Sequence, residues 1–292
     1  MSTQKPHRDT IFVEEALILS NTEHGGEQFI MRLASPKCAR AALPGQFVHL
    51  QCDPQRPMRR PISIMRASPA EGWIDLLYKR LGEGTTLLAK RRAGETASLL
   101  GPIGKGFEVT SSRPLLIGGG VGMPPMIFLA EQLRGQHTAP LVILGSEVPF
   151  PFPARPSQLL VNGAPGAMPE GVIAAMPLLD DWGIPSRLAS LQGYPGCYQG
   201  YVTDLARIWL EGLDAQQREQ VSLYACGPHP MLEAVVGVAR DYQLPVQVSL
   251  EEFMACAVGG CAGCVVEVAT TAGAAMKRVC VDGPVFDGYS VF

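Results

Sequence analysis

The chain has 292 residues, of which 47% are hydrophobic and 17% charged, and its formal net charge is -3. This length accommodates two ordinary domains, and the hydrophobic content excludes a wholly disordered chain. The calculated pI is near 6.0 and no long run of like charges occurs, so the sequence offers no basic stripe for a nucleic-acid backbone. We therefore expect small molecules or proteins as partners and no nucleic acid.

The N-terminal segment carries Lys5 and Arg8 without an apolar run behind them, so no signal peptide is predicted. No stretch approaches the roughly 20 apolar residues that a membrane span requires. We expect a cytoplasmic protein that does not bind membranes. In that reducing compartment, eight cysteines favour metal ligation or redox chemistry over structural disulfides.

Residues 8–105 predict a small antiparallel β-barrel. Short alternating runs such as "DTIFVEEALILS" and "EQFIMRLAS" are separated by turns rich in Gly and Pro. Two later motifs could bind phosphates: Arg60 in "RRPISI" through a charge-assisted hydrogen bond, and Gly84 with Thr85 at the start of a helix. By themselves these motifs fit equally a strand with a solvated arginine and an ordinary capped helix.

Residues 112–245 predict a doubly wound α/β domain with a parallel sheet. Apolar strands such as "PLLIGG", "PLVILG" and "VSLYAC" alternate with amphipathic helical segments. A stretch at about 148–170 contains six prolines, at positions 149, 151, 153, 156, 165 and 169, and predicts a surface loop or insertion. The segment "GVIAAMPLLDDWG" predicts a helix that Pro177 disturbs in its middle.

Two glycine-containing turns follow strands of this domain. The first includes Gly118 to Gly122, and the second is the segment Cys226 to Pro228. Such turns let nucleotide phosphates approach the backbone at a helix N-terminus, although the first turn alone fits an ordinary tight turn equally well. Two such turns at one sheet edge predict a dinucleotide site with Cys226 near the nicotinamide. Glu147, after the next strand, favours NAD over NADP because a carboxylate repels a 2′-phosphate.

Residues 246–292 predict a small metal-binding module. Cys256, Cys261 and Cys264 have the spacing C-x4-C-x2-C, and Cys280 follows after fifteen further residues. This is the plant-type ferredoxin spacing for a [2Fe-2S] cluster, and the small residues of the loop allow the backbone to wrap closely. The alternative is a structural zinc site, which usually has two C-x2-C pairs, whereas this chain has one.

The order of these motifs resembles the ferredoxin-NADP reductase superfamily and, within it, the iron-sulfur electron-transfer subunits of NAD-dependent dihydroorotate dehydrogenases. The resemblance implies a multidomain β plus α/β protein in which the barrel binds FAD, the α/β domain binds NAD(H) and the C-terminal module binds a [2Fe-2S] cluster. Electrons would pass to a separate FMN-containing catalytic subunit, in pyrimidine biosynthesis. Hydride transfer between NAD(H) and FAD, followed by single-electron transfer to the cluster, requires no acid, base or nucleophile from the protein, so no catalytic residue is expected.

The resemblance also implies the site residues. The FAD-binding residues would be Arg60, Pro61, Ile62, Ser63, Leu77, Tyr78, Lys79, Gly84 and Thr85. The residues facing the nicotinamide nucleotide would be Gly118, Gly119, Gly120, Gly122, Cys226, Gly227 and Pro228. The cluster ligands would be Cys256, Cys261, Cys264 and Cys280.

The sequence departs from the family pattern in three places. The segment "SLQGYPGCYQ" replaces an acidic-glycine-serine segment, the proline-rich stretch is longer, and Ala257 stands where the family usually has glycine, which we expect to be tolerated if its φ is negative. These differences leave other redox partners open, such as a hydrogenase, a glutamate synthase-like enzyme or an oxygenase. A zinc-stabilised nucleotide-binding module without redox activity is the alternative from a different class.

Overall fold

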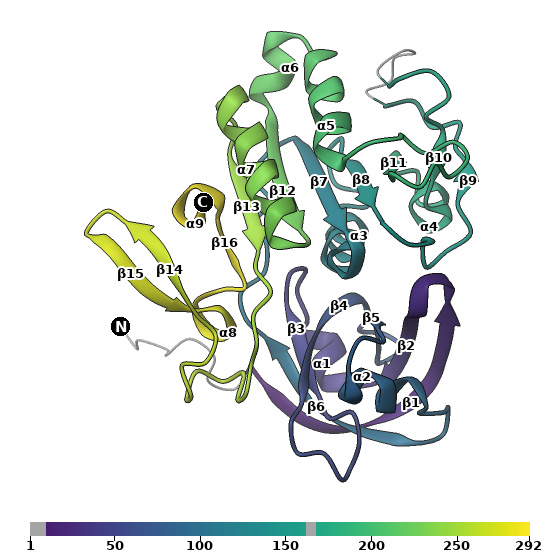
Figure 1. The fold of residues 1–292 in the computed structure, drawn as a ribbon, viewed down its shortest axis with the longest axis vertical. Helices are drawn as coiled ribbons and strands as arrows, with labels where there is room; N and C mark the ends of the chain where they lie inside the picture. The colour runs from purple at the N-terminus through teal and green to yellow at the C-terminus, as the bar shows by residue number, and fades with distance from the viewer. Residues whose placement is uncertain (1–9, 162–167) are drawn as a thin grey trace.

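The structure, a computed structural model, describes residues 10–161 and 168–292. A β-barrel, an α/β domain and a small C-terminal module lie against one another (Figure 1). The predicted start of the barrel domain at residue 8, and Pro165 of the proline-rich stretch, lie outside the described residues. No helix among the described residues is both long and apolar enough to cross a membrane.

The barrel closes in the strand order β1-β2-β5-β4-β3-β6, with antiparallel pairing of neighbours. Its elements are β1 (Phe12–His24), η1 (Gly25–Glu27), β2 (Gln28–Ala34), α1 (Pro36–Ala41), β3 (Phe47–Leu50), β4 (Arg60–Ser68), β5 (Trp73–Lys79), α2 (Glu83–Ala89) and β6 (Thr96–Ile103). Alternate residues of these strands, for example Ile62 and Ile64 of β4, point into one apolar core. The predicted antiparallel barrel is confirmed.

The α/β domain contains a sheet in the order β11-β8-β7-β12-β13-β16, in which the first five strands are parallel. Its elements are β7 (Arg113–Gly119), η2 (Gly120–Gly122), α3 (Met123–Gln132), β8 (Leu141–Gly145), β9 (Arg155–Pro156), β10 (Ala174–Ala175), α4 (Pro177–Asp181), β11 (Ser186–Ala189), α5 (Val202–Glu211), α6 (Ala215–Glu219), β12 (Val221–Cys226), α7 (His229–Tyr242) and β13 (Val246–Ser249). The strand order reverses between β7 and β12, which is where doubly wound sheets bind nucleotides. The predicted doubly wound domain is confirmed.

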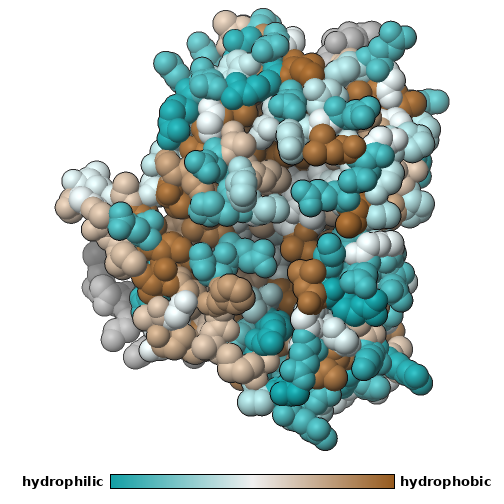
Figure 2. All heavy atoms as spheres, viewed as in Figure 1, coloured by the Kyte–Doolittle hydropathy of each residue, from teal (hydrophilic) through white to brown (hydrophobic). Residues whose placement is uncertain are grey.

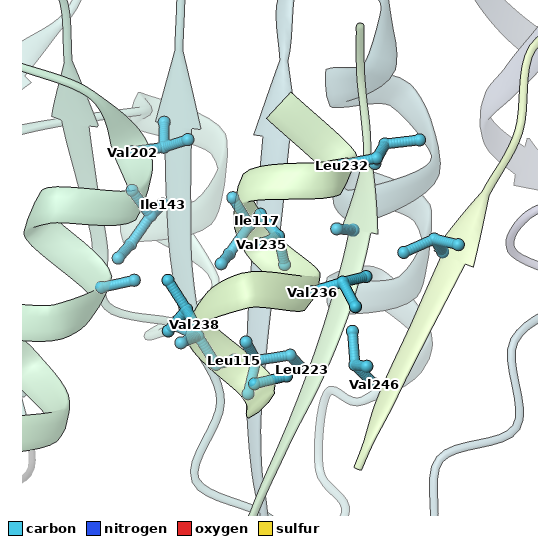
Figure 3. Close-up of a cluster of buried hydrophobic side chains, with 14 of the residues drawn as sticks. Leu115, Ile117, Ile143, Val202, Leu223, Leu232, Val235, Val236, Val238 and Val246 are labelled. Atoms are coloured by element: carbon cyan, nitrogen blue, oxygen red, sulfur yellow. The ribbon is translucent and has the colours of Figure 1, made fainter. Parts of the chain in front are cut away.

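Helix α7 covers one face of this sheet with a row of branched side chains (Figure 3). Its residues Leu232, Val235 and Val236 pack with residues of β7, β12 and β13, and all of them are buried. Burying each such side chain stabilises the fold by about 1.5–3 kcal/mol. The strand ends and turns that follow β7 and β12 are therefore held on a rigid base.

Helix α3 is shared by the two large domains. Its residues Met123 to Ala130 are all buried, which is typical of a helix that is enclosed on every side. One side packs on the sheet and the other on the barrel, where Met65 and Leu77 belong to the same apolar core. Arg66 of β4 also forms an ion pair with Glu131 of α3 at 2.6 Å. These contacts fix the barrel against the α/β domain.

The proline-rich stretch is anchored at its start. Gln28 in the barrel is buried and donates from Nε2 to the carbonyl oxygens of Gly25 and Pro149, at 2.8 and 2.7 Å. Further along, β9 pairs with β10, so part of the predicted loop is ordered as a short two-stranded sheet. We expected Pro177 to disturb the middle of a helix, and this expectation is wrong. Pro177 begins α4, because proline fits the first helical turn.

The C-terminal module continues from the sheet without an independent core. Its elements are β14 (Val265–Thr270), β15 (Gly273–Arg278), α8 (Val279–Asp282), β16 (Val285–Asp287) and α9 (Gly288–Val291). Strand β16 returns to pair antiparallel with β13 at the edge of the sheet. We predicted the third domain from residue 246, but β13 lies in the nucleotide sheet, so we propose that the third domain begins after Ser249.

Candidate functional site

The two glycine turns lie side by side at the carboxyl edge of the sheet. Strands β7 and β12 are parallel neighbours, and their register places Gly118 opposite Cys226. Gly122 lies so close to the second turn that a Cβ there would overlap the backbone of Cys226 and Gly227. We predicted that both turns lie at one edge of the sheet. In the structure their backbones are in direct contact.

Cys226 is a buried thiol rather than an exposed nucleophile. Burial raises its pKa to about 12, although a hydrogen bond with Ser249 acts in the opposite direction. The thiol is therefore neutral at physiological pH. Ser249 ends β13, two residues before Glu251, so this thiol lies where the α/β domain meets the C-terminal module.

Glu147 follows the end of β8, directly beside the first glycine turn. The register places Gly145 opposite Gly119, and Glu147 is exposed two residues later. The divergent segment 190–199 begins next to it, since the Ser190 hydroxyl donates to the Ser146 carbonyl oxygen at 2.7 Å. The carboxylate therefore lies at the carboxyl edge of the sheet, beside the first glycine turn.

The outer sides of β4 and β5 form one surface, which we call the flavin face: Pro61, Ser63 and Lys79, with Leu77 between them covered by helix α3. Ile62 and Tyr78 alternate with these residues and point into the barrel core. The Tyr78 ring is 3% exposed, stacks on Phe29 and donates its hydroxyl hydrogen to Asn21 at 2.9 Å. Leu77 points outward but is 1% exposed, because it packs in the core under α3. Of the residues predicted on these strands, Ile62, Leu77 and Tyr78 can therefore reach a flavin only through their backbone atoms.

Arg60 lies against the start of helix α2. A Cβ on Gly84 would be 3.0 Å from the Arg60 Nε atom. The absence of a side chain at Gly84 therefore allows the guanidinium to lie against the helix. Arg60 donates to the carbonyl oxygens of Met58 and Arg59 and has no carboxylate partner among the described residues. A cation beside the positive end of a helix lacks a counter-charge, and a phosphate would supply it. The Thr85 hydroxyl accepts the N–H of Leu81 at 3.0 Å, which shapes the preceding loop.

The four predicted ligands form two pairs of thiols. Cys256 contacts Cys261, and Cys264 contacts Cys280. Within residues 10–161 and 168–292, no three His, Cys, Asp or Glu side chains converge as a single metal ion would require. A tetrahedral zinc site needs four donors on one ion, whereas a [2Fe-2S] cluster needs two thiolates on each of two irons. The paired arrangement fits the [2Fe-2S] cluster better than zinc.

The two pairs differ in their surroundings. Burial acts to raise the pKa of Cys256, but N–H groups of Val258, Cys261 and Gly260 outweigh it and lower the pKa to about 7. Cys280 is buried next to the Cys264 thiol, and its pKa is raised to about 12. Backbone N–H groups pointing at the outer pair are the donors that also stabilise the sulfurs of a cluster.

Residues 251–264, which we call the cluster loop, contain two alanines in the left-handed conformation. The φ of Ala257 is +56°, so the condition under which we expected this alanine to be tolerated, a negative φ, is not met, and the φ of Ala262 is +55°. The Ala257 methyl group is 1% exposed and packs in the core with Cys264 and Cys280, which offsets the strain. Ala262 is exposed and has no such compensation.

The cluster loop lies between the barrel and the solvent. On the inner side, Met254 and Ala257 share a core with Phe47 of β3. On the outer side, Cys261 is exposed, as are Val258 (50%) and Phe253 (93%). Apolar side chains gather over this part of the molecule in the lower left of the space-filling view (Figure 2). An exposed predicted ligand surrounded by apolar groups is suited to docking of another protein.

Known sequences match this chain over most of its length. The family model for the iron-sulfur cluster binding domain of dihydroorotate dehydrogenase B matches residues 251–292. The electron transfer subunit of dihydroorotate dehydrogenase B (NAD(+)) from Desulforamulus reducens is 31% identical over 269 residues, which cover 90% of this chain and 92% of that subunit. The subunit from Geobacillus sp. is 36% identical over 251 residues, covering 83% and 84%. The chain belongs to this family of electron transfer subunits.

Solved structures agree with the family in fold. A chain of the NADH-dependent reduced ferredoxin-NADP oxidoreductase superposes with a TM-score of 0.76 at 24% identity, covering 96% of this chain and 90% of that one. The ferredoxin reductase of carbazole 1,9a-dioxygenase gives a TM-score of 0.61 at 18% identity and covers 82% of this chain. At these identities the likeness concerns the fold, and it supports the predicted ferredoxin reductase-like architecture.

Sequence reasoning missed some residues of the site. Met231 of α7 lies over both glycine turns, close to the positions that side chains at Gly119 and Gly227 would occupy. It follows the second turn directly in "CGPHPM", which was the available signal. Phe253 lies close in sequence to the predicted ligands. The sequence could not predict its exposure, because phenylalanine is usually buried.

Proposed function

We propose that this chain passes electrons between a nicotinamide dinucleotide and an FMN-containing dihydroorotate dehydrogenase catalytic subunit, through bound FAD and a [2Fe-2S] cluster. The observation that carries the proposal is the arrangement of the four cysteines as two thiol pairs beside a flavin reductase-like barrel. A flavin exchanges hydride with nicotinamide and single electrons with an iron-sulfur centre, which connects the two chemistries.

The chain's own residues bind and orient in this scheme. The turns at Gly118–Gly122 and Cys226–Pro228 would hold the dinucleotide phosphates and the nicotinamide, with Glu147 on the ribose. The flavin face and Arg60 would hold FAD, with the guanidinium and the start of α2 supplying positive charge for its pyrophosphate. The two thiol pairs would each hold one iron.

The partner would dock on the exposed side of the cluster loop, around Phe253 and Val258. The relatives named above are electron transfer subunits, which supports a separate catalytic subunit as the partner. All eight cysteines of the chain are described and none forms a disulfide, which supports a reducing, cytoplasmic location. A different redox partner on the same fold is the second candidate, favoured by the divergent segment 190–199 beside the nucleotide site.

Cofactor content tests this proposal. The full-length chain, purified anaerobically, should contain FAD, iron and acid-labile sulfide and should show flavin and ferredoxin-like absorbance. Cys264→Ser should lose iron and sulfide, whereas the matched variant Cys197→Ser, outside the module, should retain both. A colourless protein that contains zinc would contradict the proposal.

A further inference from the structure

His49 lies on the side of the barrel that the cluster loop covers. In β3 the side chains of Val48 and Leu50 point into the barrel core, so Phe47 and His49 point outward. Phe47 shares a core with Met254 of the cluster loop, and His49 lies beside the Met254 backbone. The outward side of β3 is therefore enclosed between the barrel and the loop that carries the cluster ligands.

The same side of β3 continues into the flavin face. The register with β4 places His49 opposite Pro61 and Phe47 opposite Ser63. Directly opposed residues of antiparallel strands lie on the same side of the sheet, about 4.5–5.5 Å apart between Cβ atoms. His49 thus has a flavin-face residue on one side and the cluster loop on the other.

The imidazole of His49 is buried against backbone groups of Met254 and Arg59. The residue is 1% exposed, and neither Nδ1 nor Nε2 makes a well-formed hydrogen bond among the described residues, although the backbone of Met254 and of Arg59 lies close enough to the ring to act on its pKa. A neutral imidazole has one donor and one acceptor, and buried polar groups are nearly always paired. Burial, followed by the charge of Arg59, lowers the pKa of His49 to about 4, so the ring is neutral at physiological pH.

The surrounding charges do not account for the histidine. Arg59 and Arg60 are the charged groups that face it, and no carboxylate among the described residues pairs with the ring. Arg59 is already engaged: it donates to the carbonyl oxygen of His49 at 3.3 Å and to that of Ser98 at 2.6 Å. An apolar side chain of similar size would fill the same space but could not interact with the backbone of Met254, so packing alone does not explain a histidine here.

We propose that His49 is a positioning residue for electron transfer between the flavin and the cluster, and that its ring bonds to the backbone of Met254 in the cluster loop. This bond would hold the cluster loop at its working position relative to the flavin. The inference rests on the proposed function, because it concerns the step between the two bound centres. An ordinary packing role for the side chain predicts a different response to substitution.

The test compares three variants of the full-length, cofactor-loaded protein. His49→Leu keeps the volume and removes both polar atoms, His49→Gln keeps a donor and an acceptor, and Phe47→Leu is a matched change on the same side of β3. Stopped-flow absorbance separates flavin reduction by NADH from the subsequent reduction of the cluster. EPR spectroscopy of the reduced cluster, with its midpoint potential, reports on the environment of the cluster independently of turnover.

We expect His49→Leu to reduce its flavin at the native rate, to reduce its cluster about tenfold more slowly, and to show a shifted EPR spectrum. His49→Gln should restore most of the rate, and Phe47→Leu should change neither the spectrum nor the rate. Native cluster kinetics and a native EPR spectrum in His49→Leu would overturn the inference. If His49→Leu does not fold, His49→Asn, whose amide is too short to span the gap, decides in the same way.

The same experiment distinguishes failure of the proposed electron-transfer function from failure of the proposed role of His49. A native protein whose cluster is never reduced by NADH would mean that the proposed function fails. A native protein that transfers electrons normally, with a His49→Leu variant that does the same, would mean that only the role of His49 fails.

Discussion

Gly122 of the first glycine turn packs directly against the backbone of Cys226 in the second turn, with no room for a Cβ atom. We expect Gly122→Ala to push the turns apart and to raise the KM for NADH by about tenfold, because displaced backbone groups lose binding and orientation. FAD and iron content should remain native. Gly237→Ala, at an open position of α7, is the control and should leave the kinetics unchanged. Native steady-state kinetics in Gly122→Ala would show that the close packing is not needed for nucleotide binding.

The two left-handed alanines of the cluster loop should respond differently to glycine. An alanine in the left-handed conformation destabilises the folded protein by about 1–2 kcal/mol. Glycine removes this strain, but it loses about 0.5–1 kcal/mol more conformational entropy than alanine on folding. Exposed Ala262→Gly should therefore stabilise the protein by up to about 1 kcal/mol. Ala257→Gly should be nearly neutral, because it also loses a buried methyl group worth about 0.8 kcal/mol. Anaerobic urea unfolding measures the free energy of unfolding of both variants. Equal changes in this free energy for Ala257→Gly and Ala262→Gly would contradict the prediction.

Phe253 should contribute to partner binding and not to the chemistry within the chain. At 93% exposure it contributes little to the fold, so Phe253→Ser should leave NADH-dependent dye reduction unchanged. Its affinity for the FMN-containing subunit, measured by calorimetry, should fall by about tenfold or more, as for a central aromatic anchor. Val13→Ser, an exposed apolar position on the barrel, is the control. Undiminished affinity in Phe253→Ser would place the docking surface elsewhere.

Glu147 should determine the preference between NADH and NADPH. Removing its charge in Glu147→Gln should raise kcat/KM for NADPH by about tenfold and lower it for NADH, because the 2′-phosphate no longer meets a carboxylate. Glu170→Gln, which changes an exposed carboxylate four residues before β10 in the same domain, is the control. The ratio of the two kcat/KM values, from steady-state kinetics, measures the effect. An unchanged ratio would assign the ribose contact to the divergent segment 190–199.

Much of the architecture could be predicted because it depends on local patterns. Alternation along the barrel strands, apolar runs in the parallel strands and glycines at their ends each identify an element without knowledge of its neighbours. The spacing of four cysteines likewise identified a cluster module, since ligand spacing reflects the geometry of the metal site. The two glycine turns could be paired because parallel strands share one carboxyl edge.

The remaining features depend on contacts between distant segments. The inward direction of Tyr78 depends on which side of β5 the barrel encloses, and the return of β16 to the nucleotide sheet depends on pairing with β13. The positive φ of Ala257 is set by the loop that wraps the ligands, against the preference of alanine itself. His49 is an outward residue of an apolar strand, and its enclosure becomes apparent only when the cluster loop is in place.

The measurement that tests the central claim most directly is NADH formation from dihydroorotate and NAD+ by this chain mixed with its FMN-containing catalytic subunit. We expect NADH to form only when both subunits are present, and formation to stop in Cys264→Ser while Cys197→Ser remains active. Formation of NADH that does not require this chain, or that persists at the native rate in Cys264→Ser, would contradict the account.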